Sequence, residues 1–328
     1  MTRYYTGPVS DHFDGDRFFN PGFHDDKTFA DIRKWRRTSQ PAAWPACVTE
    51  HPAPVPVAKV EGDGLRATFI GQATFLIQTN GLNILTDPFF SDRASPFSFM
   101  GPKRVRPPAI ALKDLPRIDV IALSHNHYDH MDKAALKAIW HRDKPVIVTP
   151  LGNDTIIRRA AGLKAATIHT LDWGQAYTHH SGTAFTLEQA YHWSARGLFD
   201  RRCALWGAFV IGTPHAKIYF AGDTGYRDGQ TFTDAAAKHG PFRLALLPIG
   251  AYEPRWFMAN QHMNPDDAVR AHLGLGGPYS LGMHFGTIRL TDEAMGQPEH
   301  DLAEALRAFS VAPERFHLPA FGHAHIIP

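Results

Sequence analysis

The chain has 328 residues, and its 44% hydrophobic and 20% charged content is ordinary for one large globular domain or two small ones. Its 34 basic and 32 acidic residues nearly cancel, which removes any bulk-charge argument for nucleic-acid binding. Two cysteines are too few for a disulfide framework or a thiolate zinc site, and no apolar run could span a membrane, so we expect a cytoplasmic protein.

Residues 1–60 differ in amino-acid composition from the rest of the chain. Pro52, Pro54 and Pro56 forbid regular helix where they lie, so this part is predicted to be an extended N-terminal arm packed on the body. One short helix is expected around residues 28–37. Residues 61–328 are predicted to form the main folded domain.

The body reads as strands and helices in alternation after an initial set of hairpins. Strands are predicted within 65–90, with a hairpin turn at Thr79–Gly81, and a buried strand within 117–125. Asp132 and Asn264 are expected to cap helices at 133–143 and 265–277. Further strands are expected at 144–150, 184–192, 203–212, 217–223, 244–250, 279–284 and 314–322, and further helices at 232–240 and 298–309. Two such halves predict an α/β fold with four layers, in which two sheets lie between outer helices.

The densest cluster of polar residues follows the strand within 117–125. In the string SHNHYDHMD, four side chains of metal-ligand type stand within six residues: His125, His127, Asp129 and His130. Neutral imidazole and carboxylate suit zinc or another borderline divalent metal. Four ligands this close cannot comfortably serve one ion that also keeps an open position, so two adjacent ions are the simpler interpretation.

Three other predicted strand ends each offer one further ligand type. His192 is expected to end the strand that begins at residue 184, Asp223 stands in FAGDTG, and His284 follows the strand within 279–284. Ligand sites of α/β proteins usually lie where strands end. A lone residue of this kind is usually a turn cap, but three together favour a second set of ligands.

The seven residues match in order the metal ligands of the metallo-β-lactamase superfamily. Longer strings resemble one of its branches, the N-acyl-phosphatidylethanolamine-hydrolysing phospholipase D and its bacterial relatives. These strings are LTDPFFSDRASPFSFMGPKR, SHNHYDHMD, LWGAFV, FAGDTGY, GPFRLALLPIGAYEPRWFM, QHMNPDDAVRAH and HFGT. The resemblance implies the αβ/βα sandwich fold.

The resemblance also implies a dinuclear zinc centre. His125, His127 and His192 would bind the first ion, Asp129, His130 and His284 the second, and Asp223 would bridge them. Iron, manganese or nickel are alternatives, because the same ligand types accept them.

The implied reaction is phosphodiester hydrolysis of phospholipase D type, with a hydroxide shared by the two ions attacking phosphorus. Asp129, Asp223 and His262 are the candidate catalytic residues, the last as a proton donor or phosphate contact, with a structural helix cap as the alternative for His262. Asp87 is expected to support a ligating histidine from behind.

Tyr252, Arg255 and Arg196 are candidate substrate contacts. For Arg255 the alternative is a structural salt bridge with Glu253, and for Arg196 it is ordinary solvated charge. Lys103, Arg104 and Arg106 have the same two interpretations: solvated charge, or steering of an anionic substrate. Tyr128 has no assigned role.

Three function classes remain open on the sequence. The first is a dizinc phosphodiesterase acting on N-acyl-phosphatidylethanolamine or a related phospholipid. The second is a dizinc hydrolase of a lactone or a soluble phosphodiester, and the third is a metal-binding sensor without turnover. The basic segment 28–37 could touch the inner face of a membrane only weakly, and a homodimer stays an open alternative.

Overall fold

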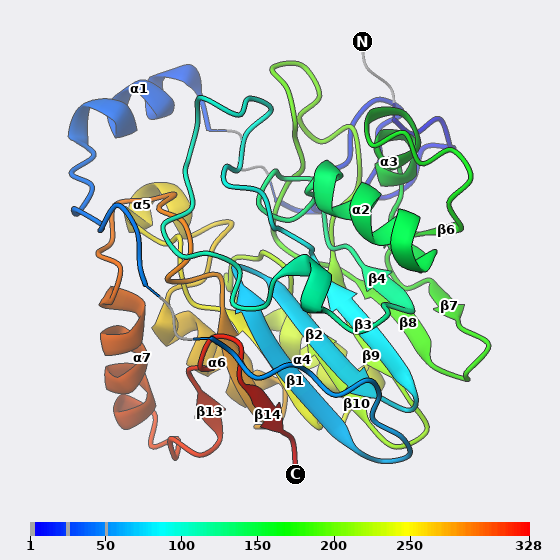
Figure 1. Cartoon of the computed structure of the whole chain (residues 1–328). Helices are drawn as coiled ribbons and strands as arrows, with labels where there is room; N and C mark the ends of the chain where they lie inside the picture. Colours follow the sequence, from blue (N-terminus) through cyan, green and yellow to red (C-terminus); the bar gives the residue numbers. More distant parts are fainter. Residues whose placement is uncertain (1–3, 24–26, 50–51) are drawn as a thin grey trace.

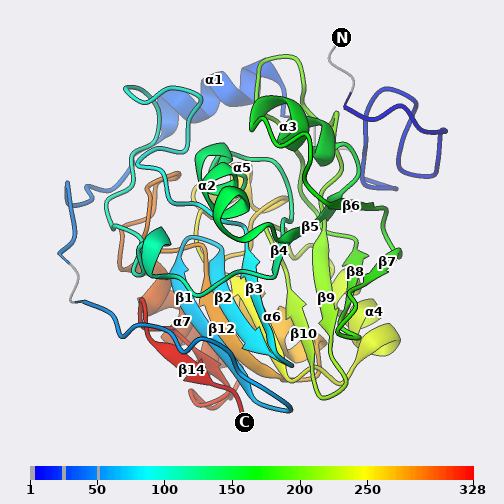
Figure 2. The ribbon, with the colours of Figure 1, turned by 45° about the vertical axis from the view of Figure 1, so that its right-hand side comes forward.

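The computed structural model of the chain describes residues 4–23, 27–49 and 52–328. Two seven-stranded mixed sheets lie in the middle of the molecule, and helices cover their outer faces (Figure 1). The turned view shows strands of both sheets in the middle of the molecule, with helices around them (Figure 2). This arrangement is the αβ/βα sandwich that the sequence predicted.

The first sheet has the strand order β14-β1-β2-β3-β4-β5-β6. Its strands are β1 Leu65–Gly71, β2 Thr74–Thr79, β3 Leu82–Thr86, β4 Val120–Ala122, β5 Val146–Pro150, β6 Ile168–Leu171 and β14 Ala324–Ile326. The pairs from β14 to β3 are antiparallel and those from β3 to β6 are parallel. Because parallel strands need crossover connections, the chain after β3 carries the helices of this half.

The second sheet repeats this plan with the order β13-β12-β11-β10-β9-β8-β7. Its strands are β7 Ala176–Thr178, β8 Ala184–Glu188, β9 Ala208–Gly212, β10 Lys217–Phe220, β11 Leu244–Pro248, β12 Tyr279–Met283 and β13 Phe316–His317. Strands β7 to β10 pair antiparallel, and β10 to β13 pair parallel. Each sheet therefore has one antiparallel and one parallel half.

Two buried apolar clusters hold the layers together. The larger joins the two sheets to each other and to the helices α4 (Gln230–His239), α6 (Pro265–Gly274) and α7 (Gln297–Ala308). The smaller lies between the first sheet and the helices α2 (Lys133–Asp143) and α3 (Asn153–Ala160). Burial of this apolar area is the main favourable term in folding such a sandwich.

Local signals explain where several elements begin. The Asp132 side chain accepts from the N–H groups of Ala134 and Ala135, which caps α2. Asn264 caps α6 in a reciprocal capping box with Asp267. Asn80 and Gly81 both have positive φ, 49° and 70°, between β2 and β3, as a tight hairpin turn requires.

The first residues of the N-terminal arm pack against the main folded domain. Phe13 and Phe18 are buried in the larger apolar cluster, and the Phe18 N–H donates to the Arg202 carbonyl at 2.8 Å. His12 Nε2 lies 2.7 Å from the Asp172 carboxylate. Residues 1–3, 24–26 and 50–51 of the predicted arm lie outside the described residues, and the division of the chain at residue 60 stays a prediction.

The predicted helix around 28–37 is α1, Phe29–Thr38, capped by Thr28. Trp35 stacks on Phe257 with ring centroids 4.9 Å apart, whereas Phe29 is 83% exposed. None of its residues is buried. The helix therefore rests on α5 (Arg255–Met258) through Trp35 and through Lys34, whose Nζ lies 4.4 Å from the centre of the Trp256 ring, and none of its residues reaches the core.

The sequence did not predict α3, α5, β6, β7, β14 or the short 3-10 turn η1 (Leu112–Asp114). Strands β7 and β14 have no buried residue, so they lack the apolar run or alternation that marks a strand. Within the described part of the chain, no helix is long and apolar enough to cross a membrane.

Candidate metal centre

Ends of strands from both sheets converge on one buried cluster. His125, His127, Asp129 and His130 follow β4, Asp223 follows β10, and His284 follows β12 directly. The predicted position of His192 was wrong in one respect: β8 ends at Glu188, so His192 lies in the loop after the strand. That loop nevertheless brings His192 into the cluster.

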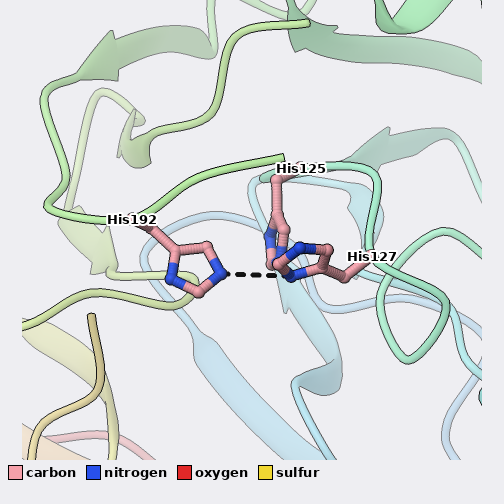
Figure 3. A group of neighbouring side chains, drawn as sticks. All are labelled: His125, His127 and His192. Atoms are coloured by element: carbon pink, nitrogen blue, oxygen red, sulfur yellow. Dashed lines mark hydrogen bonds between the residues drawn. The ribbon is translucent and has the colours of Figure 1, made fainter. Parts of the chain in front are cut away.

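The first part of the cluster consists of three imidazoles. His125, His127 and His192 each place one ring nitrogen within 4.8 Å of the others. His125 Nε2 lies 2.9 Å from His127 Nδ1, and His192 Nε2 lies 3.2 Å from the same atom. Figure 3 shows the three rings directed toward one another, with His192 coming from the opposite side.

The second part combines carboxylates and imidazoles. Asp129, His130, Asp223 and His284 place their ligand atoms within the same 4.8 Å limit. Asp223 Oδ2 lies 3.1 Å from His130 Nε2 and 3.2 Å from His284 Nε2. It is also 3.9 Å from His192 Nε2. Asp223 therefore stands between the two parts.

Burial keeps the three imidazoles of the first part neutral. It lowers the pKa of His127 to about 4 and that of His192 to about 3. Burial, helped by the neighbouring His130, also places the pKa of His125 well below its usual value. Neutral imidazole is the form that binds a metal ion.

In the second part of the cluster, neighbouring charges affect the pKa values more than burial does. Burial raises the pKa of Asp223, but the nearby His130 and His284 outweigh burial and hold it well below its usual value. Burial opposes a charge on His284, but Asp223 and Asp129 outweigh this effect and raise the pKa of His284 to about 9. Burial also raises the pKa of Asp129, but the nearby His130 outweighs burial and holds it well below its usual value, so both carboxylates are ionised at neutral pH, as ligands must be. A cation bound here would displace the proton from His284, because metal binding releases ligand protons.

A buried hydrogen-bond relay stands behind the cluster. Asp87 Oδ2 lies 2.6 Å from His130 Nδ1 and accepts from the Ser124 hydroxyl at 2.5 Å. The same hydroxyl lies 2.9 Å from His125 Nδ1. Each of these two imidazoles thus has its Nδ1 held from behind and its Nε2 turned into the cluster, the arrangement usual for metal-ligating histidines.

The donor set fits divalent cations. Three neutral imidazole nitrogens and two ionised carboxylates converge, and hydrogen bonds among them cannot satisfy all of these lone pairs. Asp223 Oδ1 is buried and has no hydrogen-bond partner among the described residues. An unpartnered buried carboxylate oxygen is costly unless a cation compensates it.

Two predicted substrate contacts, Tyr252 and Arg255, form hydrogen bonds with other residues of the protein. The Tyr252 hydroxyl donates to Asp301 at 2.6 Å. Arg255 donates to the His262 carbonyl at 3.0 Å and to Asp267 at 2.6 Å. Tyr252 thus ties its loop to α7, and the salt-bridge partner of Arg255 is Asp267 rather than Glu253, while a contact of either residue with a substrate stays a prediction.

Arg196 also has a structural role, which explains Tyr128. Its guanidinium donates to the carbonyls of Asn126 and Met131 at 2.7 and 2.9 Å and stacks on the Tyr128 ring at 3.9 Å. The Tyr128 hydroxyl donates back to the Arg196 carbonyl at 2.8 Å. These contacts fix the turn that carries His127 and Asp129. Arg196 also lines the hollows beside Tyr128, so its contact with a substrate stays a prediction.

His262 does lie at the cluster. Its Nδ1 is 3.9 Å from Asp223 Oδ2, and its ring packs against those of His192 and His284 at 5.1 and 5.6 Å. Burial lowers the pKa of His262 to about 3, which makes it a neutral hydrogen-bonding group at pH 7.

The predicted basic cluster at 103–106 is not uniform. Arg104 is buried and donates to the carbonyls of Phe89, Ser91 and Arg106, whereas Lys103 is exposed. Arg104 therefore braces the loop after β3 and cannot steer a ligand from the surface.

Two hollows adjoin the cluster. One lies beside His192 and is lined by Phe19, Asn20 and Phe23 of the arm together with Trp193, Trp206, Asn260 and Gln261. The other, which we call the groove, consists of two neighbouring hollows that share Tyr128, Lys133 and Arg196; one reaches the loop 91–96 and the other the loop 197–200. Sequence reasoning missed the contribution of the arm, because nothing in residues 19–23 marks a site.

Comparison with known proteins decides the family. The family model described as "Beta-lactamase superfamily domain" matches residues 82–285. The chain belongs to the metallo-β-lactamase superfamily. Within this superfamily, it is 40% identical over 252 residues to N-acyl-phosphatidylethanolamine-hydrolyzing phospholipase D 1 of Caenorhabditis elegans, an alignment that covers 75% of this chain and 70% of the relative.

A second member of this branch is more distant. The mitochondrial N-acyl-phosphatidylethanolamine-hydrolyzing phospholipase D of Saccharomyces cerevisiae is 31% identical over 275 residues, 82% of this chain and 58% of the relative. The chain therefore belongs to the phospholipase D branch of the metallo-β-lactamase superfamily, and it is a metal-dependent hydrolase.

A solved structure supports the fold alone. The isothiocyanate hydrolase from Delia radicum gut bacteria superposes with a TM-score of 0.62 at 21% identity, over 79% of this chain and 98% of that one. Fold likeness at this identity says nothing of the substrate.

Proposed function

We propose that the protein is a dinuclear zinc phosphodiesterase that cleaves N-acyl-phosphatidylethanolamine or a closely related phospholipid. The observation that carries the two-ion centre is the position of Asp223 between two ligand groups. One group is His125, His127 and His192, and the other is Asp129, His130 and His284. Asp223 is within 4 Å of imidazoles from both groups.

The donor types support zinc, because neutral imidazole and carboxylate are its usual ligands outside thiolate sites. Divalent cations held here would supply Lewis acidity, which activates water toward phosphorus and screens the charge of a phosphodiester. The chain itself contributes orientation: Asp87 and Ser124 hold His130 and His125 from behind, and His262 offers a neutral N–H beside Asp223.

The lipid substrate is proposed from the phospholipase D relatives. The surface next to the motif supports it. Large apolar side chains are exposed on the two loops that flank the groove over Tyr128. This apolar rim consists of Phe97, Phe99, Met100, Leu198 and Phe199.

The rim lies on the same side of the molecule as α1 (Figures 1 and 2). Leu198 is 91% and Phe199 77% exposed, which is unusual for such residues unless they contact a partner. The basic residues of α1, including Arg36 and Arg37 in its last turn, would favour an anionic lipid surface. We propose peripheral contact with a membrane through the rim in addition to the predicted segment 28–37.

A lactone or a soluble phosphodiester is the second candidate class, since the fold serves hydrolases of other substrates as well. A sensor without turnover is disfavoured by the complete set of converging ligands.

The test combines metal content with a substrate screen. The protein is purified without chelator, its metals are measured, and the zinc-loaded form is offered N-acyl-phosphatidylethanolamine, lactones and bis-p-nitrophenyl phosphate. Two metals per chain and release of phosphatidic acid are expected. Turnover of lactones alone would reject the phospholipid proposal, and a metal content near zero would reject the centre.

A further inference from the structure

The turn between β1 and β2 places an uncharged side chain, Gln72, among the proposed ligands. The pairing of β1 with β2 shifts register between Phe69 and Gly71. The backbone at Gly71 and Gln72 has φ values of 138° and 57°. A positive φ is uncommon for a residue that carries a Cβ, and bulges of this kind redirect a side chain near a site. The turn therefore holds Gln72 in a conformation that a regular hairpin would not adopt.

Contacts with the second sheet fix this turn on both sides. The Gln72 N–H donates to Thr287 Oγ1 at 2.9 Å, and its carbonyl accepts from the His284 N–H at 2.7 Å. Gln72 is only 1% exposed. The segment that carries His284 thus also anchors the backbone of Gln72, so their side chains keep a fixed relation.

The side-chain amide of Gln72 reaches two members of the second group. Nε2 lies 2.8 Å from Asp129 Oδ2 and 2.8 Å from His284 Nε2. An ionised carboxylate can only accept a hydrogen bond, so the amide N–H donates to Asp129. A hydrogen bond to a charged group is stronger than one between neutral groups, which makes this contact an effective restraint.

We infer that Gln72 is a positioning residue for the second ion, because it holds the Asp129 carboxylate beside His284. This inference rests on the proposed two-ion centre. Both side-chain contacts are with the second group, so loss of the amide should affect the second ion and spare the first. Groups that orient metal ligands typically change metal affinity 10–100-fold when removed.

The variant Gln72→Met tests this inference, since methionine has a similar length and no N–H donor. Gln78→Met is the matched control: Gln78 is equally buried on β2, but its amide donates to Val57 and Asn83. Metal-free wild type and both variants are titrated with zinc in competition with a chromogenic chelator. Circular dichroism of the metal-free proteins verifies folding.

We expect two binding steps in the wild type. Gln72→Met should weaken the second-ion step by about 10–100-fold and leave the other step within about twofold. Gln78→Met should leave both steps unchanged. Equal weakening of both steps by Gln72→Met, or no weakening of either, would overturn the inference. The number of wild-type steps tests the two-ion centre separately, and a single step would refute both.

Discussion

Asp87 and His130 form a fully buried pair in which the carboxylate lies 2.6 Å from the imidazole Nδ1. The carboxylate also accepts the Ser124 hydroxyl, which reaches His125. One side chain therefore orients a proposed ligand in each of the two groups. Asp87 has a φ of 30°, an uncommon value for a residue with a side chain, and such strain tends to persist where function requires it.

Asp87→Ala should therefore weaken zinc binding at both steps. The expected loss is about 10–100-fold, because the Nδ1 atom of His130 loses its acceptor and Ser124 loses its anchor. Competition titration with a chelator measures this change. Asp266→Ala, on the exposed face of α6, is the control and should bind zinc as the wild type does. If Asp87→Ala bound zinc as tightly as the wild type, Asp87 would not orient the ligands through His130 and Ser124.

His272 should make the fold less stable at acidic pH. It is buried in α6 with Nδ1 2.8 Å from the Ser280 hydroxyl, and burial lowers its pKa to about 4. Unfolding restores a pKa of about 6.5. Because the folded pKa is the lower one, the contribution is full above pH 6.5 and is lost as the pH falls toward 4.

Replacement of His272 by glutamine should remove this part of the pH dependence. Between pH 8 and pH 5 the free energy of unfolding of the wild type should fall by about 1 kcal/mol more than that of His272→Gln, after an allowance for solvent screening. Urea unfolding at the two pH values measures the difference. Equal falls in the two proteins would contradict the assignment to His272.

Phe18→Ala tests whether the arm belongs to the folded body. Phe18 is fully buried in the larger apolar cluster, so the cavity left by this change should cost about 3–5 kcal/mol in the free energy of unfolding. Phe29→Ala, in the exposed face of α1, should change it by less than about 0.5 kcal/mol. Urea unfolding that shows the same stability for both variants would mean that the arm is not part of the cooperative unit.

The apolar rim should determine binding to lipid. The double variant Leu198→Ser and Phe199→Ser removes two exposed apolar side chains from one loop, so binding to anionic vesicles should weaken by about tenfold or more. Vesicle sedimentation measures this binding, and the metal content should stay at the wild-type value. Val9→Ser, also exposed but in the arm, is the control. Unchanged vesicle binding in the double variant would show that the apolar rim does not contact the lipid.

The strand ends that carry chemistry could be predicted from the sequence because their signals are local. A short apolar run followed by SHNHYDH predicts both a buried strand and its polar end. Asp132 and Asn264 indicate helix starts in the same way, through contacts with residues two or three positions on. Such short-range contacts are visible in the sequence without knowledge of the fold.

Contacts across the fold could not be predicted in this way. Gln72 meets Asp129 and His284, which are 57 and 212 positions away. Tyr252 stands in a string that resembles the family and Arg196 stands outside these strings, but the partners of both, Asp301 and Tyr128, are fixed only by the packing of loops and helices. Residue type suggested a substrate role, and the tertiary contacts add a structural role that the sequence could not show.

Hydrolysis in oxygen-18 water tests the central claim most directly. Zinc-loaded protein is incubated with vesicles of N-acyl-phosphatidylethanolamine in labelled water, and the oxygen-18 content of each product is measured by mass spectrometry. Attack of water at phosphorus breaks the bond to the ethanolamine oxygen, so phosphatidic acid should carry one labelled oxygen and the released N-acylethanolamine none. Label found in a free fatty acid, or the absence of phosphatidic acid, would contradict a phosphodiesterase of this type.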